Sequence, residues 1–349
     1  MSSERVYLIG YPSDMGGASA ECWHTLQLWR RFGLDIACVP TWGDPPPCWR
    51  ARVERIGAPT ITATPDTVDK IPGIQGAVIV SFCNSHFLQN AWRFRDLQCR
   101  IVWVGCMNWL FDQEKQHYKL RGPFDAYVFQ SQYQQAVLGP QLEKYGVRPE
   151  QMHLVRAAFM TEEWPFQPRT HKKGEPLVVG RISRPAPDKF HPQTWRIYER
   201  IPHPVRARIM AWGPDVERKL GPPPPWAECL PAKVESAQQF MGKLHVMMQV
   251  NGEAIENWPR SGLEAMASGV AIVAPRKGGW CEMIRHGVTG FLADTEDEMA
   301  YYAAKMAYED GYRQFVIREA RRRLEEELAP PEMIWWRWKQ VFQSVGVSE

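Results

Sequence analysis

Short apolar runs alternate with amphipathic stretches along the chain. In the first half, the apolar runs predict strands at 6–11, 34–39, 60–63, 77–82, 101–105, 126–130 and 153–157. Between them, helical periodicity is clearest over 20–32 and 132–145. Strands that are apolar along their whole length and alternate with helices are typical of parallel sheets covered by helices on both faces. The pattern therefore predicts an α/β fold.

The alternation stops at 161–174, a polar, proline-containing stretch without periodicity that is typical of an interdomain linker. It then starts again, which predicts a second α/β domain. The expected strands of this domain are 177–182, 207–212, 245–249 and 271–274. Its expected helices are 192–200, 237–244, 261–267, 280–285 and 296–308.

The last part of the chain predicts two further helices, a charged one over 311–327 and one over 331–342. The second contains Trp335, Trp336 and Trp338, more large apolar surface than a helix exposes to water. We therefore expect 329–349 to cross back to the first domain. The predicted domains are 1–160 and 175–328, two doubly wound domains that face each other across a cleft, where such folds bind ligands at the carboxyl ends of their strands.

Length and charge fit this picture. The chain has 349 residues, enough for two domains of ordinary size, and a net charge of +3. Residues 1–160 contain 16 Lys and Arg against 14 Asp and Glu, and the remainder contains 26 against 25. Neither half has the basic excess of a dedicated nucleic-acid binder, although aromatic–basic clusters occur at 49–52 and 92–95.

Other sequence features argue against a membrane, secreted or zinc protein. No apolar run is long enough to cross a bilayer, and the first residues lack the pattern of a signal peptide. The eight cysteines form no C-x-x-C pair. These features favour a cytoplasmic protein with reduced thiols. The sixteen tryptophans are compatible with a carbohydrate ligand, because indole rings stack on sugars.

The segment 256–275 is the strongest chemical signal in the sequence. It has two glutamates eight positions apart, Glu256 and Glu264, and a predicted helix that starts near Ser261. Ser261, Gly262 and Leu263 then offer backbone N–H groups at a helix N-terminus, which is a binding site for a pyrophosphate, and Gly262 has no side chain to block its approach. Glu264 is placed to bind a ribose diol, and Glu256 to bind hydroxyls of a sugar.

This segment resembles the E-x7-E signature of family 4 retaining glycosyltransferases, with Trp258 at the aromatic position and Pro259 at a glycine position. Residues 278–292 are similar to the G-G-x-x-E-x-I-x-x-G-x-x-G-F-L sequence that follows in that family. The resemblance implies a GT-B fold of two Rossmann-like domains. It also implies that 1–160 binds the acceptor, that 175–328 binds a UDP-sugar or GDP-sugar, and that a hexose is transferred with retention of configuration.

The resemblance extends to the cations that neutralise the donor phosphates. Val179-Gly180-Arg181 resembles a G-R step at a strand end, which in the family is followed by a lysine. Arg181 is therefore the expected first cation. The second is Lys189 or Arg184, and Lys189 is favoured because it precedes a helix aimed at the cleft.

Four more residues are expected to line the site. Gly16 and Gly17 resemble a glycine turn of the family that faces the donor phosphates. His86 lies just past a buried strand, where a related histidine contacts the donor sugar or the acceptor, although a purely structural histidine is an equal alternative. Lys233 belongs to a segment, 230–234, that stands where the family backs the nucleobase with a turn.

No metal and no cofactor are expected, because the sequence has no H-x3-H pair and no D-x-D at a strand end. The charge of the leaving diphosphate would then be balanced by Arg181, Lys189 and helix N-termini. The acceptor is left open among a saccharide, a lipid-linked sugar, a small molecule and modified DNA such as hydroxymethylpyrimidine. Two further alternatives are a non-catalytic nucleotide-sugar-binding protein and a relative that uses the fold for epimerisation or phosphorolysis.

Overall fold

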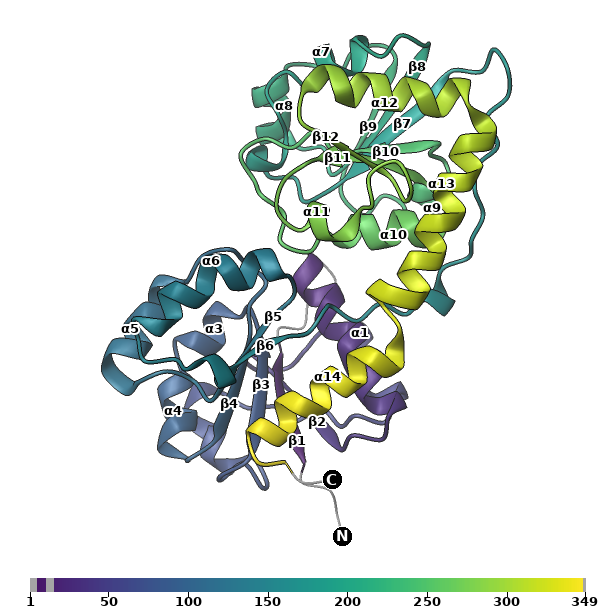
Figure 1. The fold of residues 1–349 in the computed structure, drawn as a ribbon. Coiled ribbons are helices and arrows are strands. Elements are labelled where there is room, and N and C mark those ends of the chain that lie inside the picture. The colour runs from purple at the N-terminus through teal and green to yellow at the C-terminus, as the bar shows by residue number, and fades with distance from the viewer. Residues whose placement is uncertain (1–4, 11–15, 348–349) are drawn as a thin grey trace. The chain divides into compact units, whose positions relative to one another are not determined.

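The computed structural model describes residues 5–10 and 16–347, and the chain divides into two compact units. Unit 1 consists of Met1–Met160 and Pro331–Glu349, and unit 2 of Thr161–Pro330. Each unit has its own six-stranded sheet with helices packed around it (Figure 1). The α/β class predicted from the alternating pattern is thus confirmed.

All strand pairs of unit 1 are parallel, in the order β2-β1-β3-β4-β5-β6. Its strands are β1 (Val6–Gly10), β2 (Ile36–Pro40), β3 (Val78–Phe82), β4 (Arg100–Val104), β5 (Ala126–Phe129) and β6 (Met152–Leu154). Its α-helices are α1 (Gly17–Arg31), α2 (Pro47–Arg55), α3 (Ser85–Leu88), α4 (Ala91–Asp96), α5 (Asp112–Arg121), α6 (Gln132–Glu143) and α14 (Pro331–Ser344), and its 3-10 helices are η1 (Pro65–Lys70) and η2 (Pro149–Gln151).

Unit 2 repeats this design, with the strand order β12-β11-β10-β7-β8-β9 and all pairs parallel. Its strands are β7 (Leu177–Ile182), β8 (Val205–Met210), β9 (Ala227–Leu230), β10 (Val246–Met248), β11 (Ala271–Pro275) and β12 (Phe291–Ala293). Its helices are η3 (Thr161–Glu163), η4 (Pro187–Lys189), α7 (Thr194–Glu199), α8 (Pro214–Leu220), α9 (Ala237–Met241), α10 (Arg260–Ser268), α11 (Trp280–Met283), α12 (Glu296–Tyr308), α13 (Asp310–Arg323) and η5 (Leu324–Leu328).

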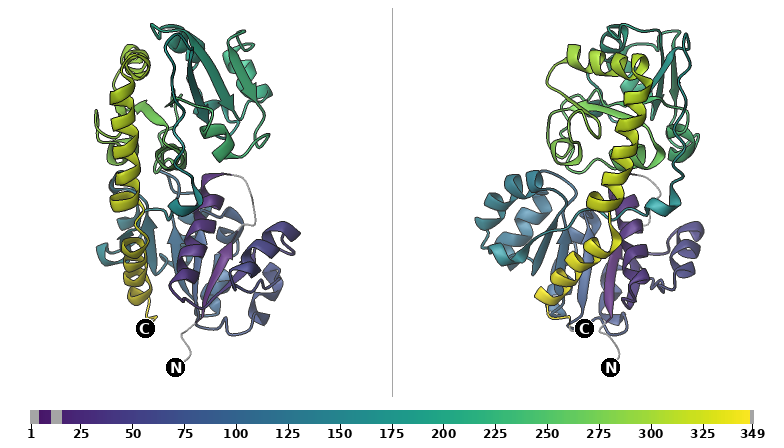
Figure 2. Two further views of the ribbon diagram at one scale, coloured as in Figure 1. Left: turned by 90° about the vertical axis from the view of Figure 1, so that its right-hand side faces the viewer. Right: turned by 45° about the vertical axis from the view of Figure 1, so that its right-hand side comes forward.

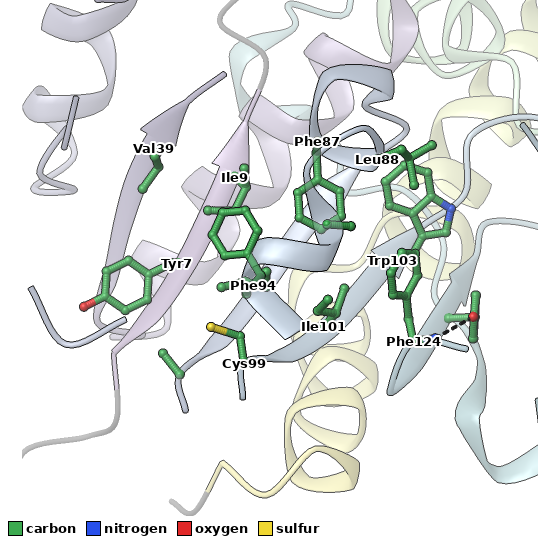
Figure 3. Packing of buried hydrophobic residues seen from close by; sticks show 14 of the residues in the cluster. Tyr7, Ile9, Val39, Phe87, Leu88, Phe94, Cys99, Ile101, Trp103 and Phe124 are labelled. Atoms are coloured by element: carbon green, nitrogen blue, oxygen red, sulfur yellow. Dashed lines mark hydrogen bonds between the residues drawn. The ribbon is translucent and has the colours of Figure 1, made fainter. Parts of the chain in front are cut away.

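The buried strands explain the continuous apolar runs of the sequence. All five residues of β1 are buried, and Tyr7 and Ile9 belong to a core that also contains aromatic residues of the helices on that face (Figure 3). Phe87 of α3, Phe94 of α4 and the segment around Phe124 contribute these rings. Both faces of this parallel sheet are covered by helices, so side chains that point to either face are buried and apolar. The strands therefore show no alternation of apolar and polar residues.

Helix α14 packs against the rest of unit 1 (Figure 2), and the tryptophans noted in the sequence lie on it. The ring of Trp338 is buried and lies 4.7 Å from that of Trp29 on α1, edge to face. Trp335 stacks on Phe32 with ring centres 5.4 Å apart. Trp336, by contrast, is 52% exposed. Two of the three tryptophans therefore fasten the end of the chain to α1 and its C-terminal turn.

Some predicted elements differ from the observed ones. Residues 60–63 make only an isolated bridge, between Cys38 and Thr60, and are not a strand. Strands β9 and β12 were not predicted, because β9 reads Ala-Glu-Cys-Leu at a half-buried sheet edge and β12 has only three residues. None of the described helices has the length and apolar character needed to cross a bilayer.

Helix α5 buries a carboxyl group whose ionisation opposes folding. Glu114 is 2% exposed and accepts hydrogen bonds from the backbone N–H of Phe111 at 2.7 Å and from the hydroxyl of Tyr118 at 3.0 Å. Burial raises the pKa of Glu114 to about 7, although these hydrogen bonds act in the opposite direction. Since the folded pKa lies above the unfolded one, the neutral acid favours the folded state below pH 4.5, and this contribution is lost as the pH rises through 7.

We therefore predict that Glu114→Gln gains stability relative to the wild type as the pH rises. The difference in unfolding free energy between the two proteins should change by about 2 to 3 kcal/mol between pH 5 and pH 8. Burial also lowers the pKa of His117 and of His245 to about 4, which gives an opposite slope at acid pH, but both proteins share it. Urea unfolding followed by tryptophan fluorescence measures the difference; an equal pH dependence in both proteins would contradict the assignment.

Candidate functional site

The predicted strand–loop–helix–strand arrangement around the two glutamates is present in unit 2. Strand β10 is followed by a loop that carries Glu256, then by α10 with Glu264, and then by β11. Helix α10 begins at Arg260, so Ser261, Gly262 and Leu263 lie in its first turn. The segment therefore reaches the carboxyl edge of the sheet, beside the end of β7, because β7 and β10 are parallel neighbours.

Two glycines hold the loop that carries Glu256. The backbone N–H of Gly279 donates to the carbonyl of Glu256 at 2.8 Å. A Cβ atom on Gly279 would lie 1.6 Å from the carbonyl oxygen of Asn257, and one on Gly278, whose φ is +55°, would lie 2.4 Å from that of Glu256. Only glycine permits this backbone approach. The structural task of this glycine pair is to position Glu256, a contact that the sequence motif alone does not reveal.

Lys189 is the cation that the structure brings to Glu256. It ends η4, and its Nζ lies 2.8 Å from Oε1 of Glu256. The backbone N–H of Ala254 donates to the carbonyl of Asp188 at 3.2 Å, which ties the two segments together. Arg184, the other predicted candidate, is exposed on the loop between β7 and η4. The geometry therefore favours Lys189 over Arg184.

Arg181 lies beneath the same segment. It is the fifth residue of β7 and is fully buried. Its Nη1 donates to the carbonyl of Val250 at 2.6 Å, and its guanidinium lies 4.3 Å from the ring centre of Phe190. Nε and Nη2 have no hydrogen-bond partner among the residues that the structure describes. Burial lowers the pKa of Arg181 to about 10, while Tyr198 and Glu256 favour the charged form, so the group is a cation at neutral pH.

The first turn of α10 differs in two respects from the expectation. The N–H of Gly262 is not unpaired, because it donates to the carbonyl of Pro259 at 3.0 Å. The structure also gives a packing reason for this glycine, since a Cβ would lie 2.4 Å from Sδ of Met283 and 2.7 Å from the ring of Trp280. The side chain of Leu263 is fully buried and contributes to the core.

Two polar side chains of this helix, Ser261 and Glu264, are half-buried. The hydroxyl of Ser261 accepts a hydrogen bond from Nε2 of Gln249 at 3.2 Å, so the end of β10 holds the start of α10. Burial raises the pKa of Glu264, and the neighbouring charge of Arg260 counteracts this. A half-buried carboxylate in this position can accept hydrogen bonds from a diol.

Lys233 lies on an exposed turn at the carboxyl end of β9. Its φ of +67° is in the left-handed region, which is uncommon for a residue with a side chain. Residues 231–234 are all exposed, and the turn leads through Glu235 into α9. Helix α9, which follows this turn, packs against α10, which carries Glu264.

The other predicted residues, Gly16, Gly17 and His86, belong to unit 1. Gly16 precedes α1 with a φ of +87°, a conformation that favours glycine, and Gly17 is the first residue of that helix. Both are exposed. The preceding residues, 11–15, lie outside the described part of the chain, so the expected turn is described only at its end.

His86 is exposed and lines a pocket of about 250 Å³ at the carboxyl end of β3. Ala18, Ser19 and Cys22 of α1 form its opposite wall. The buried side chain of Asn84 fixes this end of the strand: it caps α3 by accepting from the N–H groups of His86 and Phe87, and it donates to the hydroxyl of Thr41 at 2.9 Å. The structure thus brings His86 and the first turn of α1 to one pocket.

Among the described residues, no three side chains of His, Cys, Asp or Glu are arranged so that they could hold a metal ion. Two cationic side chains, Lys189 and Arg181, lie near Glu256 and can balance the charge of a phosphate.

Comparisons with known proteins agree with this architecture. Residues 178–308 match the family described as glycosyl transferases group 1, which covers β7 to α12 and includes Arg181, Lys189, Glu256 and Glu264. A search of curated proteins gives no match.

Solved structures resemble the chain over nearly its whole length. The structure of HepE from Anabaena in complex with UDP-glucose has a TM-score of 0.74 at 15% identity and covers 98% of this chain and 99% of its own. A sucrose-phosphate synthase from Thermosynechococcus elongatus has a TM-score of 0.72 at 13% identity, with coverage of 98% and 99%. A glycosyltransferase from Rickettsia africae has a TM-score of 0.71 at 11% identity, with both chains fully covered. The chain therefore has the GT-B fold of these glycosyltransferases, and part of its second unit is similar to the family described as glycosyl transferases group 1.

Proposed function

We propose that this protein is a retaining, metal-independent glycosyltransferase that moves a hexose from a nucleotide-diphosphate sugar to an acceptor hydroxyl. The observation that supports this most strongly is the convergence of Lys189, Arg181 and Glu256 at the carboxyl edge of the unit 2 sheet, beside the first turn of α10. Two cations and a helix N-terminus suit a diphosphate, and the carboxylate suits the hydroxyls of a sugar.

The cations have different tasks in this proposal. Lys189 is partly exposed and binds the diphosphate directly, exchanging its contact with Glu256 for a phosphate oxygen. Arg181 is held from one side by Val250 and covered by Phe190, so it acts from beneath, where a buried positive charge is poorly screened. Once Lys189 has moved, Glu256 is free to accept hydrogen bonds from the sugar.

Glu264 binds the ribose diol in this proposal, and the turn 231–234 receives the base. Helix α9, which follows that turn, packs against α10, which carries Glu264. A nucleoside whose ribose contacts Glu264 therefore extends toward the start of α9. Lys233, exposed on this turn, lies at the edge of the base site.

Unit 1 provides the acceptor site in this proposal, at the pocket lined by His86 and Ser19. The imidazole of His86 can orient an acceptor hydroxyl through a hydrogen bond. Gly16 and Gly17 leave the start of α1 open to a ligand, because neither carries a side chain.

Retention follows from a front-face route. The bond between the anomeric carbon and the leaving phosphate oxygen breaks, and the acceptor oxygen forms its bond on the same face. The acceptor proton passes to the leaving diphosphate, whose charge Lys189 and Arg181 stabilise. The protein would thus contribute orientation and electrostatic stabilisation, without requiring a metal ion.

We propose UDP as the nucleotide, because HepE, whose fold this chain shares, was crystallised with UDP-glucose. A thermal-shift panel of UDP, GDP, ADP and CDP tests the proposal. At a hundredfold excess over Kd, we expect UDP to raise Tm by about 5 to 10 °C. A shift by GDP alone would correct the base, and a failure of all four nucleotides to shift Tm would contradict the proposed function.

A further inference from the structure

The turn after β9 is an exposed part of the proposed donor site. Residues 231–234 are exposed and lie outside both the sheet and α9. A base can be recognised there only if the turn keeps one conformation, because ordering a loose loop on binding reduces affinity. The contacts that fix the two ends of this turn therefore determine whether it can bind a base.

Arg208 on β8 is anchored in the sheet, next to the strand from which the turn continues. It lies directly opposite Glu228 on β9 in the strand register, and its Nη1 is bonded to the carboxylate of Glu228. The side chain of Arg208 is only 10% exposed, and its guanidinium lies 5.7 Å from the ring centre of Phe240 on α9. Arg208 is thus enclosed between the sheet and α9.

The same guanidinium fixes the end of the turn that leads into α9. Its Nη2 lies 2.6 Å from Oε1 of Glu235, whose side chain is 11% exposed. Lys243 bonds to the second carboxylate oxygen of Glu235. Burial acts to raise the pKa of Glu235, but the bonds from Lys243 and Arg208 more than offset this and lower it, so the carboxylate is charged at neutral pH.

We propose that Arg208 is a positioning residue for nucleobase selection: anchored on β8 beside Glu228, it holds Glu235, and with it the end of the turn 231–234 that leads into α9, in the conformation that binds the base. The other end of the turn continues from β9, whose backbone pairing with β8 fixes it. This inference rests on the proposed function, because it assigns the turn to the base of the nucleotide donor. Arg208 itself is buried and makes no contact with the nucleotide.

Glu235→Gln and Glu228→Gln form a matched pair for the test. Each removes the charge of one carboxylate that is bonded to Arg208, but only Glu235 lies at the end of the turn. The phosphate cations lie on other segments, so a ligand without a base serves as the internal reference. Calorimetric titration measures the Kd of UDP, GDP and inorganic pyrophosphate for the wild type and both variants.

We expect Glu235→Gln to weaken the preferred nucleoside diphosphate about tenfold and to reduce discrimination between UDP and GDP, with pyrophosphate affinity unchanged. Glu228→Gln should leave all three values close to those of the wild type. Arg208→Lys serves as a second variant if Glu235→Gln does not fold, because one ammonium group cannot bridge both carboxylates, and it should produce the same selective loss.

Equal losses for the nucleotide and for pyrophosphate, or equal losses in the two glutamine variants, would overturn the assignment of Arg208. If the wild type binds neither UDP nor GDP more tightly than it binds pyrophosphate, the turn does not select a base. This result also overturns the assignment of Arg208. If the wild type binds none of the three ligands, the proposed function itself fails.

Discussion

Replacing Glu256 by glutamine is expected to lower kcat for sugar transfer by about three orders of magnitude. In the proposed site, the Glu256 carboxylate accepts hydrogen bonds from hydroxyls of the transferred sugar once its 2.8 Å contact with Lys189 has opened. Glutamine keeps the size of the side chain but cannot replace the charge. A coupled assay that detects the released nucleoside diphosphate, with donor saturating, measures the effect.

Glu253→Gln is the matched control for this experiment. Glu253 is exposed on the same loop, three positions earlier. It should retain the kcat of the wild type. The folding of Glu256→Gln should also be nearly unchanged, because a partly exposed ion pair contributes about 1 kcal/mol or less. Equal rates in the two variants would show that Glu256 has no role in transfer.

Gly279→Ala is expected to be the most disruptive single methyl addition near the site. A Cβ there would lie 1.6 Å from the carbonyl oxygen of Asn257, so the backbone around Glu256 must move. We expect a loss of about 3 kcal/mol in unfolding free energy, which lowers Tm of unit 2 by about 10 °C. Activity should fall at least about a hundredfold even at temperatures where the variant is folded, because Glu256 is displaced.

Gly311→Ala provides the control for adding a methyl group in unit 2. Gly311 lies in the first turn of α13, and apart from its chain neighbours and the backbone of its own helix, no described atom lies within 4 Å of the position of its Cβ. Alanine also favours the helix, so this variant should be as stable as the wild type or slightly more stable. Calorimetric unfolding of both variants tests the difference; a Gly279→Ala protein with wild-type Tm and activity would refute the positioning role of the glycine pair.

The elements that could be predicted from the sequence are those whose residues are apolar because they are buried on both faces. The buried strands β1, β3 and β11 were located from continuous apolar runs, because both faces of each are covered. Strand β9 escaped prediction because it is a half-buried edge strand with a glutamate in the middle. That glutamate, Glu228, is paired with Arg208, a long-range contact that local patterns do not contain.

Within the candidate site, the sequence located the segments but not the contacts between them. Spacing left Lys189 and Arg184 as alternatives, and only the fold brings Lys189 to Glu256. The ring of Phe190 lies over the guanidinium of Arg181 in the structure, a contact that the local sequence pattern does not contain. Gly262 was assigned to phosphate approach, but its neighbours are Met283 and Trp280, which lie far along the sequence.

A crystal structure of the protein with UDP tests the central claim most directly, namely that unit 2 holds a diphosphate at the start of α10. We predict phosphate oxygens within about 3 Å of Nζ of Lys189 and of the backbone N–H of Ser261, with Lys189 moved away from Glu256. UDP bound elsewhere on the protein, with the ion pair of Lys189 and Glu256 intact, would contradict this claim.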